Sequence, residues 1–201
     1  TDFEITAASL ARLKKTGKIK HVGVSNYNRQ QMDIFRQGCA IDMLQSPYNI
    51  FEREIDDGIL PYCHDNGIPL LTYGVLCRGL LTGKITPDRE YHGDDLRKVD
   101  PKFQQPKLNQ YLKAVDRLDK FARKNYDRRV IHLAVRWVLD QGIDIALWGA
   151  RRPDQLDALD RALDFKLDDD ARAEVVQIVK SSIDEEVGPE FMAPPKPKAA
   201  K

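Results

Sequence analysis

Four short hydrophobic runs rich in β-forming residues recur along the chain, separated by longer segments with helical spacing. Each run has the length of a single strand, and the four cover residues 19–24, 43–46, 69–73 and 143–148. Helical spacing of hydrophobic positions is clearest between the last two runs, at Leu108, Leu112, Val115, Leu118 and Ala122. The pattern therefore predicts alternating strands and helices.

A glycine stands shortly before each predicted strand, just after a helical segment. At these positions a residue in the left-handed conformation would end the helix, and they are Gly17, Gly38, Gly67 and Gly142. Repeated strand and helix units imply parallel strands joined by right-handed crossovers. The sheet is therefore either doubly wound or part of a barrel, and helix periodicity alone does not choose between them.

The chain has 201 residues, which is enough to bury a full core. We expect one folded domain over residues 1–186 and a disordered tail over 187–201, where proline and lysine dominate. Residues 77–105 contain several glycines, prolines and charges without clear periodicity. Such a long irregular connection predicts a functional loop or lid.

Composition narrows the classes of function. Thirty-two basic residues against 31 acidic ones leave a net charge of +1, so no general field attracts nucleic acid or a membrane. With 42% hydrophobic and 31% charged residues, we expect a soluble, cytoplasmic protein. The three cysteines, Cys39, Cys63 and Cys77, are too widely spaced for a zinc ribbon or a redox motif. We therefore expect reduced thiols and no metal site.

Polar residues follow each predicted strand, at the edge of a parallel sheet where ligands bind. Amide and hydroxyl groups beside one flat aromatic ring suit a ligand ring that bears a carboxamide, such as nicotinamide. The residues are Ser25 and Asn26 after the first strand, Gln45 at the second, Tyr73 and Gly74 at the third, and Gly149 to Pro153 after the fourth.

Each of these residues also has a purely structural interpretation. Ser25 and Asn26 could cap the helix that follows them. Gln45 could satisfy a strand end, and Tyr73 could be a core residue with a bonded hydroxyl. The convergence of such groups at successive strand ends favours a ligand site.

The segment Arg151, Arg152 and Pro153 favours a phosphate site. Proline suits the first turn of a helix, whose free N–H groups attract anions, and two guanidinium groups add charged donors. A barrel often binds phosphate with the loops after its last two strands, which here are residues 78–84 and 149–153. The alternative is a solvated basic face.

Four motifs, in order along the chain, resemble the aldo-keto reductases. They are residues 23–26 preceded by 17–19, then 45–49, 73–84 and 149–156. The resemblance runs from residue 1 to about 185. It implies an α/β fold of the eight-stranded β/α (TIM) barrel type, of which this chain supplies the C-terminal half with about four parallel strands and flanking helices. It further implies NADPH-dependent reduction of an aldehyde or ketone by the full-length parent.

The resemblance also implies roles for individual residues. Ser25, Asn26 and Gln45 hold the nicotinamide carboxamide, and Tyr73 stacks on the ring. The pyrophosphate is lined by Gly74, Leu76 and Arg78, and the adenosine 2′-phosphate end is held by Arg151 and Gln155 with their neighbours, including Gly149. Family members often place a polar adenine contact one turn later, where this chain has Ala158 and Leu159.

The resemblance assigns no catalytic residue to this chain. The aspartate, tyrosine, lysine and histidine that family members use lie before the matched motifs, and Tyr48, Lys84 and the four histidines occupy other positions. We therefore expect the chain alone to be inactive, and to self-associate through exposed barrel edges. Its expected partner is a small carbonyl substrate, with neither nucleic acid nor membrane. The alternative function is a non-catalytic nucleotide-binding or scaffolding half-barrel.

Overall fold

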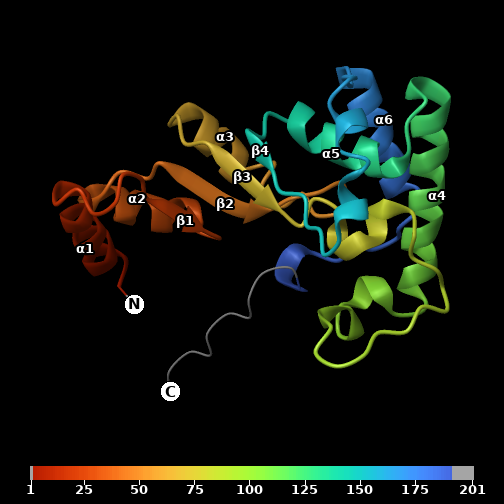
Figure 1. The fold of residues 1–201 in the computed structure, drawn as a ribbon, viewed down its shortest axis with the longest axis horizontal. Helices are drawn as coiled ribbons and strands as arrows, with labels where there is room; N and C mark the ends of the chain where they lie inside the picture. The colour runs from red at the N-terminus through yellow and green to blue at the C-terminus, as the bar shows by residue number, and fades with distance from the viewer. Residues whose placement is uncertain (1, 192–201) are drawn as a thin grey trace.

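The computed structural model describes residues 2–191, which form a four-stranded parallel sheet with helices around it (Figure 1). The strands are β1 (Gly23–Ser25), β2 (Met43–Pro47), β3 (Leu70–Tyr73) and β4 (Ile145–Ala146), and each overlaps a predicted run. Their order in the sheet is β1-β2-β3-β4. A doubly wound sheet reverses its strand order at a switch point, whereas a barrel adds strands in sequence. The sequential order therefore supports the barrel class.

Residues 2–191 include six α-helices, most of which lie toward the two ends of the sheet, with α3 beside β3 between them. In Figure 1, α1 and α2 lie beside β1, whereas α4, α5 and α6 lie at the far end. The long helix α4 buries Leu108, Val115, Leu118 and Ala122, which confirms its predicted face. The bounds are α1 Phe3–Lys15, α2 Arg29–Gly38, α3 Ile59–Asp65, α4 Lys107–Tyr126, α5 Val130–Asp140 and α6 Asp169–Lys180.

Buried hydrophobic side chains form a continuous core between the sheet and these helices. Trp137 of α5 stacks on Tyr48, which follows β2, with 5.5 Å between the ring centroids. The three cysteines are buried and free, as predicted. Burial raises the pKa of the Cys63 thiol to about 11, which keeps it protonated at neutral pH.

Three of the four predicted helix-ending glycines have the left-handed conformation. Gly17, Gly67 and Gly142 have φ values of 71°, 61° and 85°. The prediction is wrong for Gly38, which is the last residue of α2. A Cβ atom at this position would lie 3.0 Å from the Cβ of Ala7 in α1. Gly38 therefore allows two helices to approach each other closely.

Residues 77–105 fold into three short 3-10 helices, at Cys77–Thr82, Leu96–Lys98 and Pro101–Phe103. In Figure 1 the first of them, in yellow, lies between β3 and α4, and the other two lie in the yellow-green part near the lower end of α4. Asp100 and Lys102 are fully buried. Part of this irregular segment is therefore anchored in the interior rather than lying free on the surface.

The boundary predicted for the C-terminal tail is too early. Val187 is buried, and its backbone N–H donates to the Tyr111 hydroxyl at 2.9 Å. A short 3-10 helix follows at Pro189–Phe191. An apolar side chain and a satisfied N–H at residue 187 extend the folded part beyond residue 186. The rest of the predicted tail, residues 192–201, lies outside the described residues.

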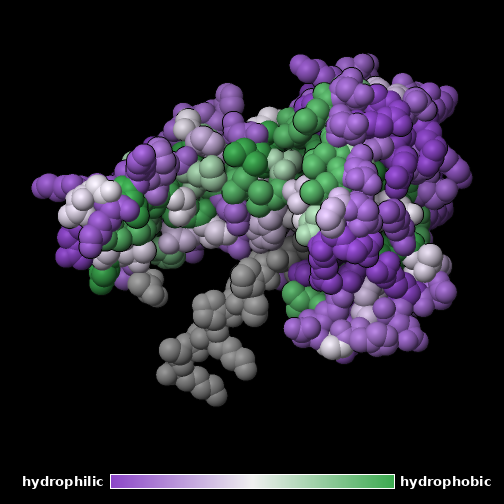
Figure 2. Space-filling model, in the orientation of Figure 1, coloured by the Kyte–Doolittle hydropathy of each residue, from purple (hydrophilic) through white to green (hydrophobic). Residues whose placement is uncertain are grey.

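Hydrophobic side chains reach the surface over the middle of the molecule, between two hydrophilic ends (Figure 2). At β4, Ile145 and the following Leu147 are 42% and 39% exposed. Within the described part of the chain, β1 pairs only with β2 and β4 only with β3, so both have an unpaired edge. No helix in residues 2–191 has both the length and the apolar character needed to cross a membrane.

Candidate functional site

Polar residues at the carboxyl ends of the first three strands lie together. Ser25 stands opposite Gln45 in the register of β1 and β2, and the Asn26 N–H donates to the Gln45 carbonyl oxygen at 2.8 Å. The Tyr73 hydroxyl, at the end of β3, donates to Asn26 Oδ1 at 3.2 Å. The four residues predicted to surround a nicotinamide therefore form one cluster.

Capping of the next helix does not explain Ser25 and Asn26. Helix α2 is capped by Asn28, whose Oδ1 accepts the Gln31 N–H at 2.9 Å, while Gln31 Oε1 accepts the Asn28 N–H at 2.9 Å. This reciprocal pair satisfies the first turn without help from residues 25 and 26. The capping interpretation is therefore wrong, and the side chain of Asn26 instead accepts the Tyr73 hydroxyl.

Strained backbone is concentrated in the same region. Among residues 2–191, four residues other than glycine have positive φ, and three of them are Asn26 (59°), Cys77 (46°) and Arg78 (50°). The fourth, Asp127, ends helix α4, where this conformation is common. Residues with a Cβ adopt it at a cost, and such residues cluster at ligand sites. The ends of β1 and β3 carry this signature.

The backbone after β3 is held in a compact turn. Gly74 has φ of 70°, and its carbonyl oxygen accepts the Cys77 N–H at 2.7 Å. The Leu76 carbonyl oxygen accepts the N–H groups of Gly79 and Leu81 at 2.9 and 3.2 Å. These turns fold Gly74, Leu76 and Arg78 into one compact segment directly after Tyr73. They are the three residues predicted to line the pyrophosphate.

Burial raises the pKa of the Tyr73 hydroxyl above its ordinary value. The hydroxyl is therefore protonated at neutral pH and acts as a donor to Asn26. Tyr73 is only partly buried, and its hydroxyl is held by Asn26. A partly exposed ring fixed in this way suits stacking on a flat ligand.

Sequence reasoning missed a buried cluster of charges beside this segment. Lys102 Nζ lies 2.8 Å from Glu52 Oε1 and 3.2 Å from Asp100 Oδ1, and all three side chains are fully buried. Arg78 Nε lies 3.7 Å from Asp100 Oδ2. The available signals were that Glu52 directly follows Phe51 and that Lys102 directly precedes Phe103, so each charge stands next to a hydrophobic aromatic residue.

The loop after β4 differs from its prediction. The segment predicted to begin a helix forms only the 3-10 turn Pro153–Leu156. Its closely spaced aspartates, Asp154, Asp157 and Asp160, are poor helix formers, which disfavours a longer helix. A four-residue turn lacks the dipole of an α-helix, so the argument from a helix N-terminus is wrong. The prediction of a phosphate site here now depends on the side chains.

The two arginine side chains of this loop differ in their surroundings. Arg152 Nε lies 2.9 Å from Asp154 Oδ1 in an ion pair. Gln155 Oε1 accepts the Arg151 N–H at 2.6 Å, and it thereby supports the backbone of the loop. The Arg151 side chain is exposed, and beyond the two neighbouring residues no heavy atom lies within 4 Å of where a Cβ of Gly149 would be. Arg151 and Gly149 therefore border open space.

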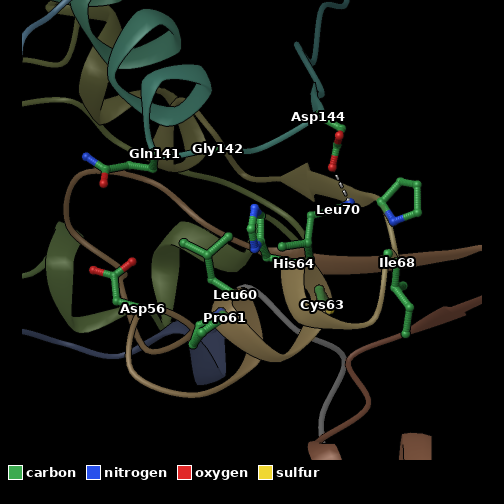
Figure 3. Close-up of a pocket in the computed structure, with 12 residues that line it drawn as sticks. Asp56, Leu60, Pro61, Cys63, His64, Ile68, Leu70, Gln141, Gly142 and Asp144 are labelled. Carbon is green, nitrogen blue, oxygen red and sulfur yellow. Dashed lines mark hydrogen bonds between the residues drawn. The ribbon is translucent and has the colours of Figure 1, made fainter.

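A cavity of about 510 Å³ lies elsewhere, at the amino ends of the strands (Figure 3). Its lining includes Leu60 and Cys63 of α3, Ile68 before β3, and Asp144 before β4. Asp144 Oδ2 already accepts the Leu70 N–H at 2.8 Å, as the dashed line shows. This cavity is at the opposite edge of the sheet from the Tyr73 cluster, so it is not the predicted cofactor site.

Comparison with known proteins decides the family. A model of the Aldo/keto reductase family matches residues 1–180. The chain belongs to the aldo/keto reductase family. Members of this family are oxidoreductases that use nicotinamide cofactors, and their fold is the TIM barrel.

Individual members match over most of this chain. Aldo-keto reductase YhdN of Bacillus subtilis is 52% identical over 194 residues, which are 96% of this chain and 59% of that protein. The NADH-specific methylglyoxal reductase of Escherichia coli is 35% identical, over 84% of this chain and 51% of that protein. Glycerol dehydrogenase AKR11B4 from Gluconobacter oxydans superposes with a TM-score of 0.87 at 44% identity, covering 96% of this chain and 59% of that structure. This aldo/keto reductase chain thus spans between half and three fifths of the length of these relatives.

Proposed function

We propose that this chain forms the cofactor side of an NADPH-dependent carbonyl reductase that acts on an aldehyde or ketone. The observation that carries the proposal is the single cluster of Ser25, Asn26, Gln45 and Tyr73 at the carboxyl ends of three neighbouring strands. Family membership supports a nicotinamide cofactor and an oxidoreductase reaction.

The cluster suits the nicotinamide end of the cofactor. A carboxamide needs both donors and acceptors, and the hydroxyl of Ser25 and the side-chain amides of Asn26 and Gln45 provide both kinds. Tyr73 provides a flat face, and its hydrogen bond to Asn26 restricts the orientation of its ring. NADPH, when bound, supplies the hydride. The chain's own residues hold the ring in one orientation and exclude water from one of its faces.

The other two segments suit the phosphates. Gly74, Leu76 and Arg78 lie in a compact turn directly after Tyr73 and would line the pyrophosphate. The guanidinium of Arg151 is exposed in the loop after β4, which Gln155 supports from within, and would bind the 2′-phosphate. This basic residue is our reason for proposing NADPH, although the E. coli relative is named NADH-specific.

We further propose that the 201 residues bind cofactor without consuming it. Reduction of a carbonyl requires a proton donor as well as a hydride. We assign that role to no residue in the four motifs, and the side chains of the histidines at 21, 64 and 92 are exposed. Turnover then belongs to a polypeptide that also carries the donor, with a small carbonyl compound as substrate in the cytoplasm.

The experiment compares Arg151→Ala with Arg152→Ala, using NADPH fluorescence to measure the dissociation constant. Arg152 is a matched control because it lies next in the chain but is paired with Asp154. Loss of one charged hydrogen-bonding partner, about 1 to 3 kcal/mol, predicts that Arg151→Ala weakens NADPH binding by roughly fivefold to 150-fold. NADH binding should be unchanged in both variants. Equal NADPH affinity in Arg151→Ala and the unmodified chain would contradict the proposed 2′-phosphate site.

A further inference from the structure

The buried ammonium group of Lys102 connects two separate paths to the segment after β3. In the first path, Lys102 Nζ pairs with Glu52 Oε1 at 2.8 Å, and Glu52 Oε2 accepts from Asn49 Nδ2 at 2.5 Å. The same Asn49 Nδ2 donates to the Gly74 carbonyl oxygen at 3.0 Å. This path ends on the first residue after β3.

The second path runs through the 3-10 helix at Pro101–Phe103. Asp100 Oδ1 lies 3.2 Å from Lys102 Nζ and also accepts the Lys102 N–H at 3.0 Å. Asp100 Oδ2 faces Arg78 Nε at 3.7 Å. This path ends on a residue with φ of 50°, which must be held in that conformation by its surroundings.

The cluster is electrically balanced, since Glu52 and Asp100 oppose Lys102 and Arg78. Burial alone would lower the pKa of Lys102, but the neighbouring carboxylates outweigh it and raise the pKa to about 12. A buried pair of this kind contributes little net stability compared with a hydrophobic replacement. The cluster therefore matters more for the positions of the groups that it contacts than for the stability of the fold.

Resting on the function proposed above, we propose that Lys102, Glu52, Asp100 and Asn49 are positioning residues for the cofactor pyrophosphate: they fix the Gly74 carbonyl and the Arg78 side chain. None of the four belongs to the predicted cofactor contacts. The irregular segment of residues 77–105 thereby has a defined task, because its Asp100 and Lys102 hold the turn that precedes them in the chain.

The test uses Asp100→Asn, which keeps the shape of the side chain and an oxygen acceptor for the Lys102 N–H but removes the charge facing Arg78. The matched control is Asp140→Asn. Asp140 also pairs with an arginine, Arg136 at 2.7 Å, and accepts a backbone N–H, from Leu167 at 2.8 Å, but it lies at the end of α5. Dissociation constants are measured for NADPH and for adenosine 2′-monophosphate, which has the 2′-phosphate but no pyrophosphate.

We expect Asp100→Asn to weaken NADPH binding about tenfold while the affinity for adenosine 2′-monophosphate changes less than twofold. Asp140→Asn should change neither affinity. A purely structural role would move both ligands together, so equal losses in Asp100→Asn overturn the positioning role. Unchanged NADPH affinity in this variant also overturns it.

Misfolding of the variant and failure of the proposed function can each be distinguished from failure of the positioning role. If Asp100→Asn fails to fold, as circular dichroism would show, Asn49→Ala replaces it, because that change cuts the path to Gly74 and leaves all four charges paired. NADPH affinity in Asn49→Ala should fall about fivefold, while the affinity for adenosine 2′-monophosphate should not change. If Asn49→Ala binds NADPH as tightly as the unmodified chain does, the inference is overturned. If the unmodified chain binds neither ligand, the proposed function itself fails.

Discussion

The Tyr73 hydroxyl donates to Asn26 Oδ1 at 3.2 Å and so joins the end of β3 to the end of β1, across β2. The bond fixes an aromatic ring that we propose stacks on the nicotinamide. Removing the hydroxyl in Tyr73→Phe keeps the ring, so NADPH affinity should fall less than about threefold. Tyr73→Ala removes the stacking face, which is worth about 1 kcal/mol or more, and affinity should fall roughly tenfold.

The two Tyr73 variants are compared by NADPH fluorescence titration, with thermal unfolding as the control for folding. A loss in Tyr73→Phe as large as that in Tyr73→Ala would mean that the hydroxyl matters more than the ring. That result would contradict stacking.

Much of the fold could be predicted from the sequence because the strand runs, the helical spacing of hydrophobic residues and the glycines between them indicate the same element boundaries. All four strands lie within or overlap the predicted runs, and the helical face of α4 is the predicted one. The prediction for Gly38 was wrong because a glycine at a helix end can either adopt the left-handed conformation or allow another helix to pack closely. Only the position of Ala7 in three dimensions decides between these roles. The choice of a barrel over a doubly wound sheet likewise needed strand order, which periodicity does not contain.

The residues of the candidate site could be predicted from the sequence only where they directly follow strands. Ser25, Asn26, Gln45 and Tyr73 stand at strand ends, and the parallel sheet aligns those ends. The charges of the Lys102 cluster come from two connections that are distant in the chain, so spacing could not pair them. The short turn after β4 was overestimated as a helix because a proline marks where a helix begins but not how far it continues.

Close packing of α1 on α2 predicts the effect of enlarging Gly38. Gly38→Val adds three carbon atoms where a single Cβ already lies 3.0 Å from Ala7, so the free energy of unfolding should fall by about 1 to 3 kcal/mol. Gly58→Ala is the matched control, since no heavy atom lies within 4 Å of its Cβ position and its φ is −149°. Denaturant unfolding should show a smaller loss for the control than for Gly38→Val. Equal stability of Gly38→Val and the unmodified chain would contradict the close helix approach.

A buried histidine predicts a pH dependence of stability. Burial lowers the pKa of His132, and nearby arginines, Arg129 first, add to this effect. The unfolded chain therefore takes up the proton first, near pH 6.5. The stability contributed by neutral His132 is complete above that value and is lost as the pH falls from it toward the lower pKa of the folded state.

His132→Gln removes this titration and keeps an acceptor for the Arg129 N–H, which His132 Nδ1 now accepts at 3.0 Å. Between pH 7.5 and 5.5, the unmodified chain should lose stability relative to His132→Gln. The control His64→Gln changes a side chain that is 89% exposed, and it should leave the pH slope unaltered. Parallel pH curves for the unmodified chain and His132→Gln would refute the assignment.

The unpaired strand edges predict self-association. An edge strand presents free backbone groups, and at β4 the exposed Ile145 and Leu147 add apolar surface. Light scattering after gel filtration should show species above 23.0 kDa that increase with concentration. Ile145→Lys should reduce them, whereas Leu96→Lys, at an exposed site in the irregular segment, should not. A monomer at all concentrations would contradict this prediction.

The central claim is that the carboxyl ends of β1, β2 and β3 form a nicotinamide cofactor site. Its most direct test is a titration of the 201-residue chain with NADPH, followed by cofactor fluorescence, while circular dichroism verifies that the chain is folded. Saturable binding of one NADPH per chain, weakened by Tyr73→Ala, is the predicted result. A folded chain that binds no NADPH at millimolar concentration would contradict the account.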